Sequence, residues 1–171
     1  FLSGSPAIDE VLNNKITSRK VLEKKLCIKF FGNEILLIFH PVTTQSELSG
    51  KQISTILDGI SVLKKPTIAL GPNSDAGSKE ILDNLLKFSK KHEYFHFYKN
   101  MPRSDYLGLL ENVGVLIGNS SSGIIEASYF AIPVVNIGIR QKGRETGKNV
   151  KNVDGLKSTP IQNAILQALK Q

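Results

Sequence analysis

The chain has 171 residues, 40% of them hydrophobic, and 22 Lys and Arg against 15 Asp and Glu give a net charge of +7 at pH 7. A chain of this size buries about two thirds of its unfolded surface, so a stable core needs neither a disulfide nor a structural metal. The single cysteine, Cys27, fits a reducing, cytoplasmic location and is expected to pack in the core. Apolar runs such as Ile35 to Phe39 are too short to span a bilayer. These features argue against secreted, membrane and disordered classes, and they predict one domain over residues 1–171.

The N-terminal region carries two features of its own. The chain begins at Phe1 without a signal peptide, so we expect a truncation boundary there. Basic residues then crowd the stretch from Lys15 to Lys29, interleaved with apolar residues at near-helical spacing. This pattern fits a solvated helix face, and it also fits a basic nucleic-acid-binding module. Because only 7% of residues are aromatic and tryptophan is absent, stacking platforms are poorly supplied, and we expect no nucleic-acid partner.

Predicted helices and strands alternate along the chain after a helical lead-in over residues 1–29. Apolar runs of strand length, rich in β-branched and aromatic residues, are separated by segments of helical period. The predicted strands are Glu34 to Phe39, Thr67 to Leu70, Tyr94 to Tyr98, Val113 to Ile117, Val134 to Ile137 and Asn149 to Val153; the predicted helices are Gln45 to Leu63, Lys79 to Lys91, Arg103 to Glu111, Ile124 to Phe130 and Pro160 to Lys170. This alternation predicts an α/β fold, a Rossmann-like parallel sheet with helices on both faces.

Three predicted helix starts carry capping residues. Thr44-Gln45-Ser46-Glu47 fits a capping box, in which the Thr hydroxyl and the Glu carboxylate each accept a hydrogen bond from a free backbone amide. Ser5-Pro6 and Thr159-Pro160 place a capping hydroxyl before a proline at the first helical position. We therefore expect helices to begin directly after Ser5, Thr44 and Thr159.

Ligands of open parallel sheets bind beyond the carboxyl ends of the strands, so the loops there are the candidate site. The loop from Gly118 to Gly123 holds three serines between a strand and a predicted helix. Free amides, the hydroxyls of the three serines and the helix dipole at such a point favour an anion, and Gly123 lets the backbone approach it closely. A serine-rich cap with no ligand is the alternative. The loop lacks the Lys-Ser/Thr ending of a P-loop, which argues against an NTPase.

Four further side chains at this edge are candidates. Glu126, in the first turn of the predicted helix, would serve the helix dipole or accept two ribose hydroxyls. Arg140 and Arg144 would neutralise a diphosphate, or belong to an exposed basic loop. His40 ends an apolar strand, where a charged or hydrogen-bonding imidazole would face the ligand.

His92-Glu93-Tyr94-Phe95-His96 matches the His-Glu-x-x-His pattern of zinc proteases in form only. That site needs both imidazoles on one helix and a third ligand downstream. Here the pattern straddles a predicted helix end and strand, and the remaining histidine lies upstream. We expect no metal site and no cofactor.

Four blocks taken together resemble the hydrolysing UDP-N-acetylglucosamine 2-epimerases, over nearly the whole chain. The blocks are His40 to Thr44 (HPVTT), Pro72 to Glu80 (PNSDAGSKE), Ile117 to Gly123 (IGNSSSG) and Arg140 to Val150 (RQKGRETGKNV). The Pro-Val-Thr-Thr that follows the histidine points to the hydrolysing branch of this family.

The resemblance implies a two-domain GT-B enzyme of which this chain is the C-terminal, UDP-binding domain, with the N-terminal half absent. By the resemblance, Ser120 and Ser121 hold the diphosphate and Glu126 takes the ribose hydroxyls. His40, Asn73, Asp75 and Arg140 line the same UDP-sugar pocket, and the backbone from Tyr98 to Met101 meets the uracil. His40 is the one catalytic candidate, because the other acid/base groups belong to the absent half. The full-length enzyme is expected to be a homo-oligomer.

The implied reaction eliminates UDP from UDP-N-acetylglucosamine and hydrates the resulting glycal to N-acetylmannosamine, at the start of sialic and related nonulosonic acid synthesis. Two alternatives share the UDP site: a hydrolysing 2-epimerase for UDP-diacetylbacillosamine, and half of a GT-B glycosyltransferase. The block from Arg140 to Val150 argues against the transferase. The isolated chain is expected to bind UDP weakly and to be inactive.

Overall fold

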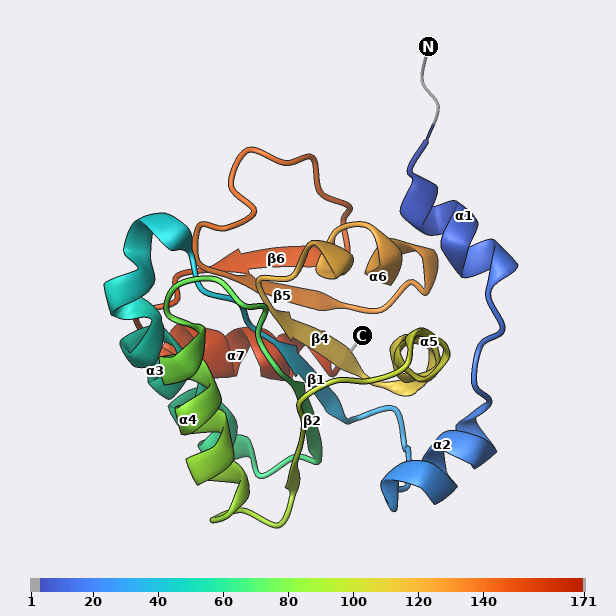
Figure 1. Cartoon of the computed structure of the whole chain (residues 1–171), viewed down its shortest axis with the longest axis horizontal. Coiled ribbons are helices and arrows are strands. Elements are labelled where there is room, and N and C mark those ends of the chain that lie inside the picture. Colours follow the sequence, from blue (N-terminus) through green and yellow to red (C-terminus); the bar gives the residue numbers. More distant parts are fainter. Residues whose placement is uncertain (1–3, 171) are drawn as a thin grey trace.

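The computed structural model describes residues 4–170 and is built on a six-stranded sheet (Figure 1). The strand order is β3-β2-β1-β4-β5-β6, and every neighbouring pair is parallel. The strands are β1 (Ile35–Ile38), β2 (Thr67–Leu70), β3 (Phe95–Tyr98), β4 (Val115–Gly118), β5 (Val134–Ile137) and β6 (Val150–Val153). Each predicted strand is present within two residues of its expected bounds, and the order is that of the Rossmann fold. The predicted fold class is confirmed.

Helices cover both faces of the sheet (Figure 1). One face packs against α3 (Ser49–Leu63), α4 (Ser78–Ser89) and α7 (Ser158–Ala168); the other packs against α1 (Pro6–Asn13), α2 (Arg19–Leu26), α5 (Arg103–Asn112) and the short α6 (Glu126–Tyr129). None of the helices within residues 4–170 has the length and apolar character needed to cross a membrane.

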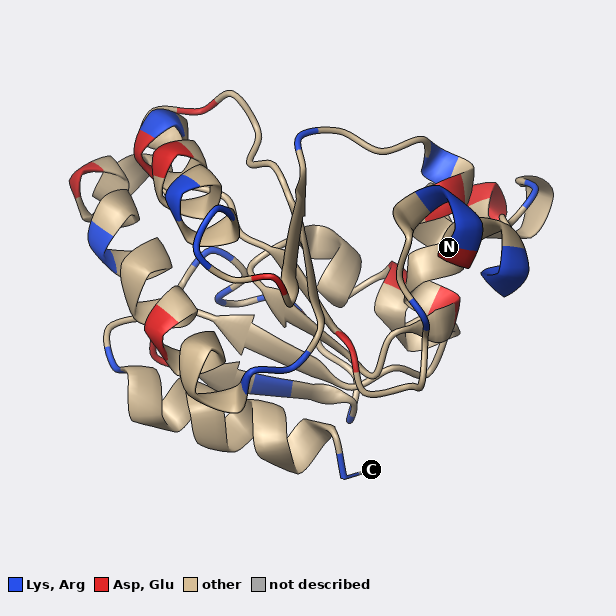
Figure 2. Ribbon diagram, turned by 90° about the horizontal axis from the view of Figure 1, so that it is seen from below, with Lys and Arg blue, Asp and Glu red and all other residues tan. Residues whose placement is uncertain are grey.

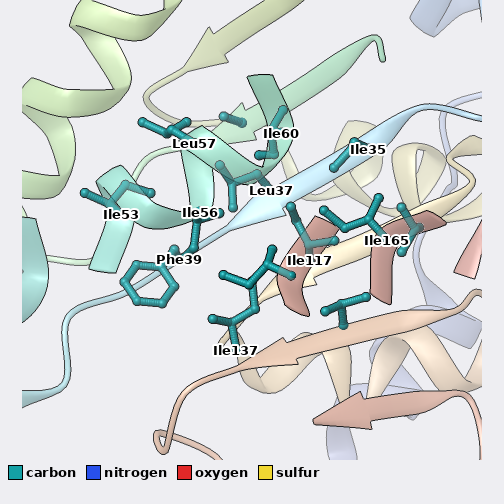
Figure 3. Close-up of a cluster of buried hydrophobic side chains, with 14 of the residues drawn as sticks. Ile35, Leu37, Phe39, Ile53, Ile56, Leu57, Ile60, Ile117, Ile137 and Ile165 are labelled. Atoms are coloured by element: carbon teal, nitrogen blue, oxygen red, sulfur yellow. The ribbon is translucent and has the colours of Figure 1, made fainter. Parts of the chain in front are cut away.

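The core consists of two apolar layers, one on each side of the sheet. Side chains of a strand alternate between faces, so Ile35 and Leu37 of β1 enter one layer while Leu36 and Ile38 enter the other. Figure 3 shows the first layer, in which β1, β4 and β5 face the isoleucines of α3 and Ile165 of α7. Because β1 is buried on both faces, it reads as a continuous apolar run, as expected of a central parallel strand.

The predicted capping box at Thr44 is wrong. A 3-10 helix, η1 (Thr43–Leu48), precedes α3, and its capping position is Val42, with no side-chain cap bond. Gln45 leaves helical geometry at φ −140°, so Thr44 and Glu47 do not stand at the start of one continuous helix. The kink separates the loop after β1 from α3, and that loop lies at the sheet edge where ligands bind.

The other two predicted caps fare differently. Helix α1 does begin after Ser5 with Pro6 in its first turn, but the Ser5 hydroxyl makes no cap bond. Helix α7 begins at Ser158 behind Lys157, so Thr159 lies inside the helix and its predicted capping role is wrong. Each proline lies within two residues of the start of its helix. The predicted hydrogen bonds from the backbone to the Ser5 and Thr159 hydroxyls depend on local geometry that the sequence does not determine.

Cys27 and the basic stretch around it lie on the surface. Cys27 is exposed at the left-handed end of α2 (φ 54°), so the prediction that it packs in the core is wrong; Leu26 takes the buried position beside it. Leu22 of α2 is also buried, while the lysines of this stretch are exposed, as a solvated helix face requires. Figure 2 shows basic and acidic residues together on the helices near the N-terminus. Lys25 and Lys29 are paired with carboxylates there.

Candidate functional site

The site is built where β1 and β4 lie side by side. The strand that follows β1 in the chain, β2, lies towards one edge of the sheet, and the strand that follows β4, β5, lies towards the other edge. Ligands of such sheets bind at the point where the strand order reverses in this way. His40 follows β1, and Asn119 follows β4. The His40 amide donates to Oδ1 of Asn119 at 2.7 Å, and Nδ2 of Asn119 donates to the His40 carbonyl at 2.8 Å. This reciprocal pair joins the two loops across the seam, which is the line where β1 and β4 pair.

Gly118 makes this close approach possible. Its φ is +129°, and a Cβ at this position would lie 1.9 Å from the carbonyl oxygen of Ile38. The Asn119 amide donates to that same carbonyl at 3.1 Å. Only glycine fits here, so the first glycine of the predicted anion loop sets the approach of β4 to β1.

A cavity of about 370 Å³ opens beside this seam. It brings together three of the predicted residues after β4, the predicted histidine after β1, and the segment after β3 where uracil was expected. Its lining comprises Ile38, His40, Leu70, Gly71, Lys99, Asn100, Met101, Arg103, Tyr106, Ser120, Ser121, Ser122 and Glu126. Residues at or after the carboxyl ends of four strands thus line one cavity, at the edge of the sheet where the sequence predicts the site.

The serine loop differs from its prediction in how it would hold an anion. Instead of a helix from Ile124 to Phe130, the chain forms a 3-10 turn, η2 (Ser121–Gly123), and the single-turn helix α6. The Ser120 hydroxyl accepts from the Ser122 amide at 3.3 Å, and the Gly123 amide donates to the Ser120 carbonyl at 3.1 Å. These two amides are engaged within the turn, and the one-turn helix that follows carries a smaller dipole than the predicted helix would.

Gly123 lies beneath the loop rather than in the cavity. It is buried, and a Cβ would come within 3.1 Å of the Val134 side chain and 3.4 Å of Leu116. Its absence of a side chain therefore lets the serine turn pack on β4 and β5.

Glu126 is nearly buried and is paired with an arginine that sequence reasoning missed. Its side chain is 8% exposed, and Oε1 accepts from Nη2 of Arg103, the first residue of α5. The guanidinium of Arg103 lies over the ring of Tyr106, and the Tyr106 hydroxyl bonds to that of Ser122. Burial raises the pKa of Tyr106, so the phenol keeps its proton. No motif marked Arg103 or Tyr106, because their partners lie on another element.

The imidazole of His40 is neutral. Its Nδ1 accepts from the Asn73 amide at 3.0 Å, which places the proton on Nε2. Burial lowers the pKa of His40 to about 4, assisted by the charge of Arg140 and opposed by that of Asp75. Of the two predicted forms, charged or hydrogen-bonding, the structure has the hydrogen-bonding one near pH 7.

The remaining predicted residues flank the cavity. Asn73 donates through Nδ2 to Asp75 and lines a second cavity of about 430 Å³, which shares Gly71, Lys99 and Asn100 with the first. Asp75 and Arg140 line a third cavity of about 310 Å³. The predicted set is therefore gathered at one sheet edge but spread over three hollows.

Gln141 is a buried residue that the sequence analysis did not single out. Its Nε2 donates to the Asn119 carbonyl at 2.7 Å, and Nη1 of Arg140 donates to the same oxygen at 3.1 Å. The loop after β5 is thereby attached to the seam. The only sequence signal for Gln141 was its membership of the block that begins at Arg140.

Three candidates of the sequence analysis lie elsewhere. Arg144 is exposed and lines none of these three cavities. His92 stacks on Phe88 in the turn after α4, while His96 belongs to β3, so the two imidazoles do not share a helix. Within residues 4–170 no three His, Cys, Asp or Glu residues are grouped as a metal site would require.

Comparison with known proteins now decides the family. Residues 1–171 match the family model described as UDP-N-acetylglucosamine 2-epimerase. The chain belongs to this family. It is 34% identical to a hydrolysing UDP-N,N'-diacetylbacillosamine 2-epimerase of Legionella pneumophila, over 100% of this chain and 44% of the relative. It is 29% identical to a UDP-N-acetylglucosamine 2-epimerase of Neisseria meningitidis, over 96% and 43%. This epimerase-family chain spans less than half the length of these relatives.

The fold is also that of a solved family member. The UDP-N-acetylglucosamine 2-epimerase of Methanocaldococcus jannaschii, solved in complex with UDP-GlcNAc and UDP, superposes with a TM-score of 0.69 at 18% identity. The match covers 100% of this chain and 48% of that one. The predicted family resemblance is confirmed, and so is the prediction that the chain corresponds to about half of such an enzyme.

Proposed function

We propose that this chain is the nucleotide-binding half of a hydrolysing UDP-N-acetylglucosamine 2-epimerase acting in sialic or related nonulosonic acid synthesis. The observation that carries the proposal is the hydrogen-bonded joining of His40 to Asn119, which places a neutral imidazole beside three serine hydroxyls in one cavity. The whole enzyme would convert UDP-N-acetylglucosamine and water to N-acetylmannosamine and UDP. UDP leaves from C1 while C2 loses its proton to a base, which forms the glycal, and water then adds across the C1–C2 double bond.

The leaving group of that reaction is a diphosphate, and the cavity offers donors for it. Ser120 and Ser121 would donate their hydroxyls to the phosphates, and the Nε2–H of His40 would donate to an oxygen that gains charge as the C1–O bond breaks. Glu126 would accept the ribose hydroxyls, with the uracil at the backbone of residues 98–101. Asn73, Asp75 and Arg140 would line the same pocket near the phosphates and the sugar.

Turnover would require groups outside this chain. Among the cavity residues, Glu126 is paired with Arg103 and assigned to the ribose, and the lowered pKa of His40 makes its imidazole a weak base for the proton on C2 of the sugar. We therefore expect the chain to bind UDP weakly without releasing it from UDP-N-acetylglucosamine. Measurable UDP release by the purified chain would contradict this expectation. A homo-oligomer of the whole enzyme remains part of the proposal.

A second sugar is supported by the comparisons. The Legionella relative, which acts on UDP-N,N'-diacetylbacillosamine, is the more similar of the two at 34% against 29% identity. Both enzymes would use the same UDP site, so the distinction lies in the sugar. Incubation of a full-length parent enzyme with each UDP-sugar, followed by identification of the released sugar, would separate these two candidates. Transfer of sugar to an acceptor in that assay would favour a glycosyltransferase instead.

The direct test is calorimetric titration of the chain with UDP, UMP and UDP-N-acetylglucosamine. We expect saturable binding of UDP well above that of UMP. Ser121→Ala and Arg140→Ala should each weaken UDP binding about tenfold or more, since one charge-assisted hydrogen bond contributes about 1.5–3 kcal/mol. Ser128→Ala is the matched control, because this exposed hydroxyl donates only to the Ile125 carbonyl of its own helix. Unchanged affinity in both site variants would count against the pocket.

A further inference from the structure

Arg103 and Glu126 form an ion pair inside the cavity proposed for the nucleotide. The two residues stand 23 positions apart, at the start of α5 and in α6. The Glu126 side chain is 8% exposed and that of Arg103 is 34% exposed. A carboxylate so far removed from water needs a cation nearby, and Arg103 supplies it.

The guanidinium of Arg103 is itself held from two further directions. Its Cζ lies 5.6 Å from the ring centroid of Tyr106, and the Tyr106 hydroxyl bonds to Oγ of Ser122. Nη2 also lies 3.7 Å from Oε2 of Glu10 on α1. Three elements thus fix the direction from which the cation approaches Glu126, so the carboxylate has a defined orientation before any ligand arrives.

The pair uses one carboxylate oxygen. Nη2 of Arg103 donates to Oε1, and within residues 4–170 no hydrogen bond or ion pair reaches Oε2 of Glu126. An ionised carboxylate can only accept, so the remaining capacity of this group matches hydroxyl donors. Vicinal hydroxyls of a ribose are such donors, whereas phosphate oxygens are not.

We propose that Arg103 is a positioning residue that orients Glu126 towards the ribose and thereby sets a preference for ribonucleotides over nucleotides without these hydroxyls. The inference rests on the proposed function. It adds a residue that determines whether the ribose hydroxyls of the nucleotide are required for binding. Arg103 acts through Glu126, so its loss should erase the preference itself rather than weaken all nucleotides alike.

The test titrates the chain with UDP and with 2′,3′-dideoxy-UDP, and the measured quantity is the ratio of the two dissociation constants. The proteins are the wild type, Arg103→Gln, Glu126→Gln and the double variant. Arg144→Gln is the matched control, because it removes the same charge from an exposed position outside the cavities. Thermal melts of each protein show whether it is folded. The double variant avoids leaving Glu126 charged, buried and unpaired.

We expect the wild type and Arg144→Gln to prefer UDP about tenfold or more, as one charge-assisted hydrogen bond would give. In Arg103→Gln, Glu126→Gln and the double variant the preference should fall to about threefold or less, with no further loss in the double variant. If Arg103→Gln or the double variant keeps the full preference, the inference is overturned while UDP binding, and with it the proposed function, stands. If the wild type binds neither nucleotide at millimolar concentration, both proposals fail.

Discussion

Replacing His40 by glutamine should change how the stability of the chain depends on pH. In the folded protein the imidazole is neutral down to a pKa of about 4, against an ordinary value of 6.5, because it is buried and faces Arg140. Between these two pH values the His40 imidazole is protonated in the unfolded chain and neutral in the folded chain. The free energy of unfolding therefore falls as the pH drops from 6.5 towards 4, and His40 has no such effect above that window.

The size of this effect follows from the two pKa values. One pKa unit corresponds to about 1.4 kcal/mol, so at pH 4.5 the unfolded state gains about 2.5 kcal/mol relative to the folded state through His40 alone. The His40→Gln variant lacks the titrating group, while its amide oxygen can still accept from the Asn73 amide. We expect the variant to lose about 2.5 kcal/mol less stability than the wild type between pH 7 and pH 4.5.

Denaturant unfolding of both proteins at pH 7, 6, 5 and 4.5 measures this difference. Carboxylates titrate in both proteins and cancel in the comparison, so only the gap between the two curves is interpreted. Parallel curves would refute the argument, because they would mean that His40 takes up its proton equally in both states. A proton resonance titration of the imidazole in the folded chain checks the same pKa directly.

Two further predictions concern the framework of the site and of the N-terminal region. Gly118→Ala should cost more than about 3 kcal/mol of stability or prevent folding, because its Cβ would overlap a β1 carbonyl at φ +129°; Gly143→Ala, at φ +84° with open space around it, should cost only about 1 kcal/mol in the same melts. Asp105→Asn should cost about 2–3 kcal/mol, since the carboxylate accepts from the Thr17 hydroxyl at 2.6 Å and pairs with Lys25 at 2.9 Å. Burial raises the pKa of Asp105, but these two partners outweigh it and lower the pKa overall, so the wild type should lose this advantage over the variant as the medium is acidified below the ordinary carboxyl range. Equal stability of Asp105→Asn and the wild type at pH 7 would contradict the role of this carboxylate.

The strands were predictable because their signal is local and strong. Central parallel strands are buried on both faces, so β1, β4 and β5 appear as short apolar runs in the sequence. The loops after them were predictable as the site for a geometric reason, since the carboxyl ends of parallel strands meet at one edge.

The failures share the opposite cause. Whether Thr44 caps a helix depends on the kink at Gln45, and whether Cys27 is buried depends on where α2 ends against the sheet. Arg103 belongs to the site only because α5 and α6 bring it to Glu126. Each of these outcomes is decided by tertiary packing, which a pattern of residue types along the chain does not specify.

The seam between β1 and β4 has a consequence for how the chain assembles. Strands β1, β2 and β3 form one contiguous stretch of sequence and β4, β5 and β6 another, and within the sheet the two stretches pair only through β1 and β4. Ile35 pairs with Val115, 80 residues later, so during synthesis β1 and β4 cannot pair until the second stretch has left the ribosome. The cavity straddles this late junction, and a ligand bound in it would bridge the two stretches and oppose their separation.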